Sequence, residues 1–542
     1  MVNTLILAAI TALFVTATIY LGWYGYKSTK NNSEFLLGKN KSSPILIALS
    51  YGATFISTSA IVGFGGMSAM YGMSLIWLVV LCIAVGTILA FIVFGKRTRK
   101  KGNELKSFTF SDLLGKMFKS ESIRTVSALI VLIGMPVYCA AVLLGGVNFI
   151  SVTVGIDKDI ALLGLSLIVV LYVTYGGVIA VMYNDALQGA IMFVGMIFIL
   201  GFTLYHLGGI TEANTALGEL WRTKVSDPGF AGLVSGGMRG WTSSPEFGSN
   251  IWLTVVTTLL MGVGIGSIAQ PQLAVRFMSA KDDKTINRSM WIGAVFIVVI
   301  LGAAFTIGPL SNVFFDNEHG LTAMEYMAVH FNGNSDMIIP TFVNELFMGI
   351  TFGDVFISIF ILALVCASIS TMSALLHTMG ASAGYDLWSQ WQARKGDKKE
   401  IAKEMVKSLK TSRISTMLMM VVVVVFAYVM PGSIIAVATT VFMGLTAAAI
   451  LPTYAHGLFS DNPDTTAAKV SIAVGATSWT IWALFVNAKI SGLVGTPLIV
   501  EAGSWMTFVD PLVIGLPLSA IALIVVYFVR RFAGRTADAE TE

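Results

Sequence analysis

The sequence predicts an all-α membrane protein with about thirteen transmembrane helices. Of its 542 residues, 56% are apolar and only 12% are charged, whereas soluble domains average about 25% charged residues. The mean hydropathy is +0.80. Most of the apolar residues come in runs of roughly 20 or more, which is the length of helix that crosses the hydrocarbon core of a bilayer. This composition excludes an ordinary soluble enzyme.

Charged residues and clusters of Gly, Pro and Asn separate thirteen apolar segments. The ninth is too long for a single crossing, so its first turns should lie outside the membrane. The three cysteines, Cys82, Cys139 and Cys366, fall inside apolar segments without metal-ligand spacing, which indicates buried packing residues. We expect helices over residues 3–26, 45–71, 73–96, 123–151, 159–177, 182–207, 250–271, 288–312, 345–384, 412–430, 433–458, 466–488 and 511–530.

The basic residues predict the orientation in the membrane. Of the 34 Lys and Arg residues, 28 fall in five stretches, which we interpret as solvated anchoring loops. Loop 312–345 holds five acidic residues and no Lys or Arg. By the positive-inside rule the N-terminus lies outside and the C-terminus is cytoplasmic, in a multi-pass plasma-membrane protein. The net charge of +4 gives no reason to expect a nucleic-acid partner. The basic stretches are 27–41, 96–124, 272–288, 386–413 and the C-terminal tail from Arg530.

Two segments have interiors that are poor helix formers. Residues 48–66 of the second combine hydroxyl side chains with glycines, and residues 261–271 of the seventh have three alternate glycines before a proline. Gly costs about 1 kcal/mol and Pro about 3 kcal/mol inside a helix, so both segments are predicted to unwind. Close helix packing explains the glycines equally well. Unwound backbone at membrane depth requires protein, water or an ion to satisfy its carbonyl groups.

The positions of these two segments indicate an inverted repeat. They are five segments apart, and an odd offset reverses the direction of crossing, so two five-helix units of opposite orientation are expected, with alternating access around a midplane site. The expected division is 1–44, the peripheral first helix and a cytoplasmic loop; 45–208, the first repeat; 209–249, an extracellular loop; 250–458, the second repeat; and 459–542, two peripheral helices and a cytoplasmic tail.

Segment 9 holds a candidate cation site. Ser370 and Thr371 follow Ala367 by three and four residues, which places all three on one helical face. Hydroxyl oxygens and a freed carbonyl are hard, neutral ligands suited to a small alkali cation. A hydroxyl in a membrane helix also commonly bonds back to the carbonyl four residues earlier, and this alternative stays open.

Taken together, these segments and several further motifs resemble the sodium/solute symporter family. The resemblance runs through about residues 1–460, with its motifs in the family's order. The motifs are Glu34-Phe-Leu-Leu-Gly38, Thr109-Phe-Ser-Asp-Leu113, Tyr175-Gly-Gly-Val-Ile-Ala-Val181 with Asp185 and Gln188, Gln270-Pro-Gln-Leu-Ala-Val-Arg-Phe277, and Ala367-Ser-Ile-Ser-Thr371.

The resemblance implies a five-plus-five core and sodium as the coupling ion. Carried over by position, one sodium ion would be bound by backbone oxygens of Ala53, Ile56 and Ala367 and by the hydroxyls of Ser370 and Thr371.

Asp185 has two interpretations. It lies near the start of the sixth helix, where a carboxylate serves as an N-cap or interacts with the helix dipole. The resemblance implies a second sodium site instead, since some family members use an acidic residue at this position.

The solute is expected at the two breaks and on the helices that face them. Hydroxyls and an amide bind a carboxylate or a hydroxylated solute without an expensive buried charge. The acid of proline carriers falls on Phe55 here, and their aromatic pair falls on Val263 and Ser267, while stretch 53–66 is more similar to pantothenate and monocarboxylate carriers. We predict import of a small organic acid, with proline or another amino acid as the alternative. The expected contacts are Ser57, Thr58, Ser59, Ser267, Gln270, Thr439 and Thr440.

Two rivals come from other classes of protein. A membrane-embedded enzyme needs clustered His, Asp or Glu at membrane depth, and the sequence has no H-E-x-x-H or paired-carboxylate motif, so we expect no enzyme. A passive channel is compatible with the same helices, and accumulation of solute against its gradient would exclude it. The predicted partners are a small-molecule solute, sodium ions and the lipid bilayer, and the sequence predicts no oligomeric state.

Overall fold

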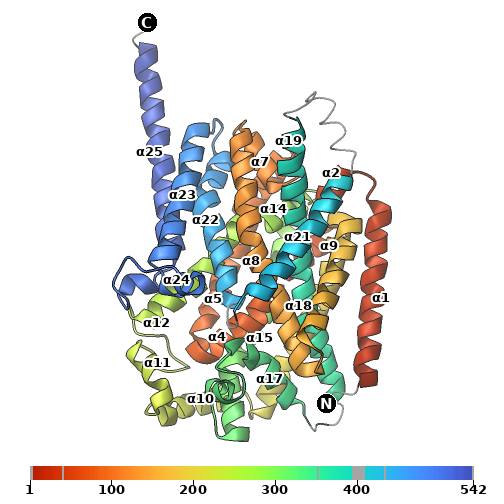
Figure 1. Ribbon diagram of the computed structural model, residues 1–542, viewed down its shortest axis with the longest axis vertical. Helices are drawn as coiled ribbons and strands as arrows, with labels where there is room; N and C mark the ends of the chain where they lie inside the picture. The colour runs from red at the N-terminus through yellow and green to blue at the C-terminus, as the bar shows by residue number, and fades with distance from the viewer. Residues whose placement is uncertain are drawn as a thin grey trace.

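The protein is a bundle of helices in all the parts that the computed structural model describes, which are residues 4–38, 42–348, 350, 353–393, 409–431 and 435–539. Most of the long helices run roughly along one direction (Figure 1), with the N-terminus near one end of the bundle and the C-terminus beyond the other. Within these ranges the β-type pairing is a single isolated bridge between Ser42 and Ala280.

The elements follow one another closely along the chain, so few long connections lie between them. The first half contains α1 (Thr4–Ser28), α2 (Asn32–Leu37), α3 (Pro44–Phe55), η1 (Ser59–Gly63), α4 (Phe64–Tyr71), η2 (Gly72–Leu75), α5 (Ile76–Leu81), η3 (Cys82–Gly95), α6 (Lys96–Glu104), α7 (Phe110–Met117), α8 (Glu121–Val154), α9 (Lys158–His206), α10 (Ile210–Lys224), η4 (Pro228–Phe230) and α11 (Ala231–Ser235).

The second half begins with a further interrupted helix. It contains α12 (Asn250–Leu253), η5 (Thr254–Met261), α13 (Gly262–Gly264), η6 (Gly266–Ala269), α14 (Pro271–Met278), α15 (Asp283–His319), α16 (Ala323–His330), η7 (Ser335–Met337), α17 (Ile338–Leu346), α18 (Gly353–Ala381), η8 (Ser382–Trp388), α19 (Ser389–Ala393), α21 (Lys410–Val429), α22 (Ile435–Phe459), α23 (Thr465–Phe485), α24 (Ala488–Val494), η9 (Trp505–Phe508) and α25 (Pro511–Ala539).

Eleven helical runs in the described residues are long and apolar enough to cross a membrane. Two of them, Ser59–Glu104 with 46 residues and Lys158–His206 with 49, are too long for one crossing, since 49 helical residues extend about 74 Å. Each contains a glycine in a left-handed conformation, Gly72 with φ of 68° and Gly177 with φ of 60°. The second of these kinks lies where we expected the fifth helix to end. The count of thirteen stays a prediction, as does the inverted repeat.

Polar caps and glycines set the ends of the long helices. The hydroxyl of Ser120 accepts a bond from the backbone of Ile123 at the start of α8, and Asp282 does the same for Thr285 at the start of α15. Gly155 and Gly320 end these helices in the left-handed conformation. Such caps satisfy the backbone groups that a helix end leaves unpaired. Of the ninth predicted segment, 345–384, the first two residues belong to the separate helix α17, and the long helix α18 begins at Gly353. The placement of its first turns outside the membrane stays a prediction.

Burial separates a central from a peripheral set of helices. Between 61% and 78% of the most apolar window is buried in the runs of α8, α9, α15, α18 and α22. The corresponding shares are 17% for α1, 33% for α23 and 22% for α25. These three are the helices predicted to be peripheral. Helix α21, which we assigned to the second repeat, is only 33% buried. The cysteines Cys82, Cys139 and Cys366 are buried, as predicted.

Candidate ion and solute site

The first predicted break lies between α3 and η1. Helix α3 ends at Phe55, and Ile56 is extended, with φ of −90° and ψ of 108°. The backbone N–H of Ile56 still donates to Gly52, at 2.8 Å, and the next helical bonds start from the carbonyl of Ser57. The last carbonyl groups of α3 are therefore at an open helix end, deep inside the bundle.

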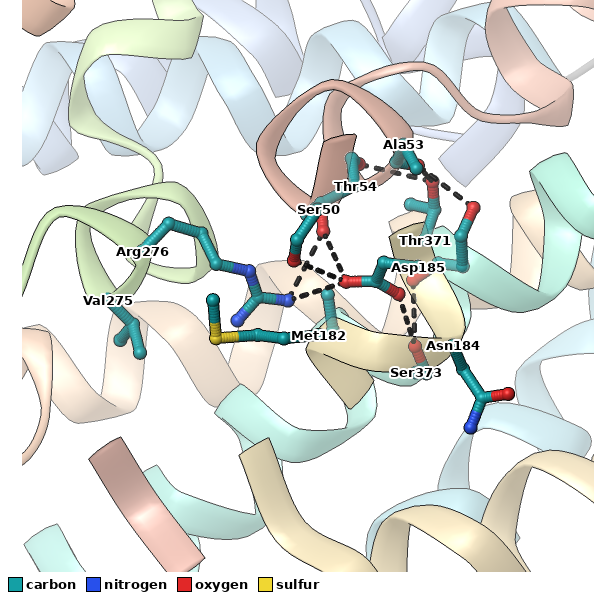
Figure 2. A network of polar contacts seen from close by, with 12 residues as sticks. Ser50, Ala53, Thr54, Met182, Asn184, Asp185, Val275, Arg276, Thr371 and Ser373 are labelled. Carbon is teal, nitrogen blue, oxygen red and sulfur yellow. Dashed lines mark hydrogen bonds and ion pairs between the residues drawn. The ribbon is translucent and has the colours of Figure 1, made fainter. Parts of the chain in front are cut away.

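Two hydroxyls of α18 point at this open end. The hydroxyl of Ser370 donates to the carbonyl of Ala53 at 2.9 Å. The hydroxyl of Thr371 lies 3.3 Å from the same carbonyl and 3.1 Å from that of Thr54 (Figure 2). Ala53, Ser370 and Thr371 are fully buried. Turned toward a cation, these oxygens would form the all-oxygen ligand set that hard cations prefer.

The other two predicted cation ligands adjoin this contact. Ala367 is fully buried, and its carbonyl lies 3.4 Å from the hydroxyl of Ser370. Ile56 is also fully buried and directly follows α3, but the hydroxyl contacts are to Ala53 and Thr54. The structure thus brings four of the five predicted residues into direct contact and adds Thr54, which the sequence argument did not name.

Asp185 is the centre of a second polar cluster, which shares Thr54 with the first. Ser50 and Thr54 donate to its Oδ2 at 2.7 and 3.3 Å, and Ser373 donates to Oδ1 at 3.3 Å. The guanidinium of Arg276 lies 3.0 Å from Oδ2 and 3.2 Å from the hydroxyl of Thr54. The cluster joins α3, α9, α14 and α18 (Figure 2).

Two interpretations of charged residues need correction. Asp185 lies inside α9, two turns beyond the kink at Gly177, so it caps no helix end. Arg276 was counted with the solvated loop 272–288, but it is only 1% exposed and belongs to the buried helix α14. A count of basic residues by loop does not detect burial, and a buried guanidinium requires a partner such as Asp185.

The second break lies at Gln270, rather than along the preceding glycines. Gln270 is extended, with φ of −76° and ψ of 118°, and Pro271 begins α14. Gly264 and Gly266 remain helical and allow close packing. A Cβ atom would lie 2.5 Å from the side chain of Leu81 at the first and 2.7 Å from that of Met443 at the second. The packing explanation therefore holds for these two glycines, and the unwinding is confined to the residue before the proline.

A small enclosed cavity of about 20 Å³ lies between the two broken helices and α8, α15 and α22. It has room for about one water molecule. Ser57, Tyr138 and Thr439 contribute hydroxyls to its lining, and its other residues are apolar or Cys. A cavity of this size cannot hold an organic solute unless the surrounding helices separate.

Of the residues predicted to contact the solute, some line this cavity and others form hydrogen bonds elsewhere in the protein. Ser57 and Thr439 line the cavity. Ser59 is fully buried, and its hydroxyl has no hydrogen-bond partner among the described residues. The remaining four are bonded elsewhere: Thr58 to Val142 at 2.8 Å, Ser267 to Gly264 at 2.8 Å, Gln270 to Thr446 at 2.7 Å and Thr440 to Val437 at 2.9 Å.

Sequence reasoning missed Tyr138 and Arg276. Tyr138 lies within the apolar run of α8, and its hydroxyl interacts with Ser57, so nothing in its neighbourhood in the sequence identifies it. Arg276 carried a usable signal, because a single charge between Val275 and Phe277 in an apolar octapeptide is unusual for a solvated loop.

Comparison with known proteins gives a family match over most of the chain. The sequence pattern of the Sodium:solute symporter family matches residues 35–475. A sodium/pantothenate symporter of Haemophilus influenzae is 27% identical over 456 residues, which cover 84% of this chain and 85% of the relative. A high-affinity proline transporter of Bacillus subtilis is 26% identical over 479 residues, which cover 87% and 90%.

A solved structure matches the fold as a whole. The substrate-bound, outward-open structure of a Na⁺-coupled sialic acid symporter superimposes with a TM-score of 0.70 over 96% of each chain. The sequence identity is 17%. At this identity the similarity establishes the arrangement of helices, which the two proteins share.

Proposed function

The chain belongs to the sodium:solute symporter family, with sodium as its coupling ion, and we propose that it imports a small organic acid by alternating access. The acid would be a monocarboxylate or a pantothenate-like molecule. Each sodium ion that enters across 100 mV releases about 2.3 kcal/mol, in addition to its concentration term, and this energy drives the uptake.

The observation that carries the proposal is the contact between α18 and the open end of α3. Carbonyl oxygens of Ala53 and Ala367 and hydroxyls of Ser370 and Thr371 converge in a fully buried position. We assign the coupling sodium to these four residues together with Ile56. Binding there would hold α3 against α18, and the break that follows α3 continues directly into Ser57 at the solute cavity. A sodium ion that fixes the backbone at the break also fixes Ser57, which is part of the solute site. Sodium binding would thereby be coupled to solute binding.

Asp185 is our candidate for a second sodium ion. Its carboxylate and the hydroxyls of Ser50, Thr54 and Ser373 offer oxygen ligands from three helices. Arg276 already neutralises this carboxylate at 3.0 Å, so a sodium ion would have to displace the guanidinium or bind beside it at Oδ1. Because Thr54 belongs to both clusters, the two ions would not bind independently.

The cavity supports a solute with hydroxyl or carboxylate groups and an apolar body. Ser57, Tyr138 and Thr439 supply the polar groups, and Phe55 and Val263 form part of the apolar wall. The last two positions are those at which proline carriers differ from this chain. Pantothenate and proline, named in the two relatives, both carry a carboxylate, so an amino acid remains the second candidate.

Transport assays in liposomes test this function. Purified protein in liposomes that contain potassium should accumulate a labelled monocarboxylate or pantothenate against its gradient when sodium is added outside. Replacement of the external sodium by potassium should abolish the accumulation. Sodium-driven accumulation of proline without uptake of any acid would favour the second candidate. Downhill flux that is insensitive to sodium would contradict a symporter and indicate a channel.

A further inference from the structure

A large pocket with a basic lining lies at the end of the bundle where the C-terminal helix emerges. It measures about 840 Å³ and is lined by the last turns of α6 and α7, the last turn of α22, residues 527–531 of α25 and the loop that enters α23. Of these helices, α23 and α25 belong to the peripheral set, and both pack against α22 and against each other (Figure 1). Its cationic residues are Lys101, Lys116, Lys119, Arg530 and Arg531, against Asp461 and Asp464.

Three of the five cations have no acidic partner in the part of the chain that the structure describes. Lys116 pairs with Asp112 at 2.8 Å, and Arg530 pairs with Asp464 at 3.1 Å. Arg531 instead donates to the hydroxyl of Tyr527 at 2.8 Å.

Lys101 and Lys119 form no ion pair with any described residue, although both line the same pocket. The pocket therefore has an unbalanced positive charge that a bound anion would neutralise.

The pocket lies where candidate membrane-spanning helices end. Helix α22 ends at Phe459 and α23 begins at Thr465, so the pocket surrounds the place where two spanning helices leave the membrane. Large apolar side chains beside it are exposed, with Phe459 at 46%, Phe528 at 50% and Phe532 at 63%. An anionic group in the pocket could thus be joined to acyl chains that cover these rings. This is the arrangement of basic pockets that bind acidic lipid headgroups between membrane helices.

We propose that this pocket binds the phosphate group of an anionic phospholipid. Lys101, Lys119 and Arg531 contact the phosphate, and the acyl chains lie along the exposed face of α25. The bound lipid holds the peripheral helix α25 against α6 and α7. A direct hydrogen bond already joins α7 to α23, since the hydroxyl of Thr465 donates to the carbonyl of Phe118 at 2.8 Å. The proposal does not depend on which solute is transported.

The test compares three ligands on the purified full-length protein in detergent. Phosphatidylglycerol, phosphatidylcholine and inorganic phosphate are titrated separately, and the melting temperature is measured, since a ligand that binds the folded state raises it. The pocket variant is K101Q/K119Q/R531Q. The control K281Q/K284Q/R288Q removes the same charge from exposed residues at the start of α15, outside the pocket.

We expect phosphatidylglycerol to raise the melting temperature of the wild type and the control by several degrees, whereas phosphatidylcholine and inorganic phosphate do not. The pocket variant should need about tenfold more phosphatidylglycerol, or more, for the same shift. If the triple variant does not fold, the single variant K119E at an exposed position provides the same comparison.

Other outcomes would overturn the proposal. An equal loss in the pocket variant and the control would show general charge attraction. Stabilisation by inorganic phosphate at millimolar concentration, equal to that by the lipid, would identify a soluble phosphate as the ligand. An identical response of the wild type to both lipids would exclude an anion site.

Discussion

At the scale of single residues, the partner of each hydroxyl in α18 distinguishes the candidate ion ligands from their neighbours. Thr378 bonds back to the carbonyl of Ala374 at 2.8 Å, within its own helix. Ser370 and Thr371 instead bond across to the open end of α3. A hydroxyl whose partner lies in its own helix is satisfied locally, whereas one that also bridges to the open carbonyl end of a second helix can exchange that partner for an ion.

Replacement of both bridging hydroxyls should therefore weaken sodium binding selectively. We expect S370A/T371A to raise the sodium concentration for half-maximal uptake by about tenfold or more, by analogy with lost ligand support at other metal sites. The control T378A removes a buried hydroxyl from the same helix and should change the sodium concentration for half-maximal uptake by less than about twofold. Uptake and sodium-dependent melting temperature are both measured. An unaltered sodium response in the double variant would show that the sodium ion does not bind at Ser370 and Thr371.

Residue spacing was sufficient to place the α18 residues on one face, while their contact with Ala53 was implied by the family resemblance, and spacing was insufficient for the solute contacts. A pair three and four residues after Ala367 must share its face, so Ser370 and Thr371 could be placed together. Ser267 and Thr440 each bond to a carbonyl three residues earlier, and no sequence pattern distinguishes that bond from one to a ligand. Thr54 was missed because its role depends on α18, which is distant in the sequence.

At the scale of elements, glycines permit close contact more often than they break helices. The helices between 59 and 71 and between 262 and 269 persist through their glycines, and the breaks fall at 56–58 and at Gln270. In an apolar environment, a glycine keeps its backbone hydrogen bonds, whereas a proline removes a donor. Helix propensity thus located both interrupted segments, but the interruptions lie at 56–58 and at Gln270 and not at the glycines.

Two glycines of α15 provide a matched test of this packing role. A Cβ atom at Gly308 would lie 2.2 Å from the carbonyl oxygen of Gly65, so the backbone of α4 must move, while nothing lies within 4 Å of a Cβ atom at Gly302. We expect G308A to destabilise the protein by about 1–3 kcal/mol and G302A to be neutral or slightly stabilising. Unfolding of both variants in detergent measures this. Equal stability of the two would contradict a close contact between α15 and α4.

At the scale of the whole molecule, the distribution of charged residues between the two ends of the bundle indicates how the protein is oriented in the membrane. Helices α10 and α17 lie at one end of the bundle, and α7 and α19 lie at the other (Figure 1). The loop 312–345, which extends into α17, holds five acidic residues and no Lys or Arg. The second end also carries the basic pocket and the last turns of α25. Separation of charge by end is what the positive-inside rule requires, and from it we infer that the second end faces the cytoplasm.

Cysteine labelling in intact cells tests this orientation. The native cysteines are buried, so they should give no background labelling. Cys82, Cys139 and Cys366 are buried, so the wild type should not react with a membrane-impermeant maleimide. Ser244 lies in an exposed part of the loop 209–249, and Lys284 is exposed at the opposite end. We expect S244C to be labelled in intact cells, and K284C to be labelled only after the membrane is permeabilised, because the reagent cannot cross the bilayer. The reverse pattern would place the C-terminus outside and would make the proposed lipid pocket a site for the outer leaflet. Labelling of both cysteines in intact cells would mean that the two ends are not separated by a membrane, which would contradict the whole arrangement.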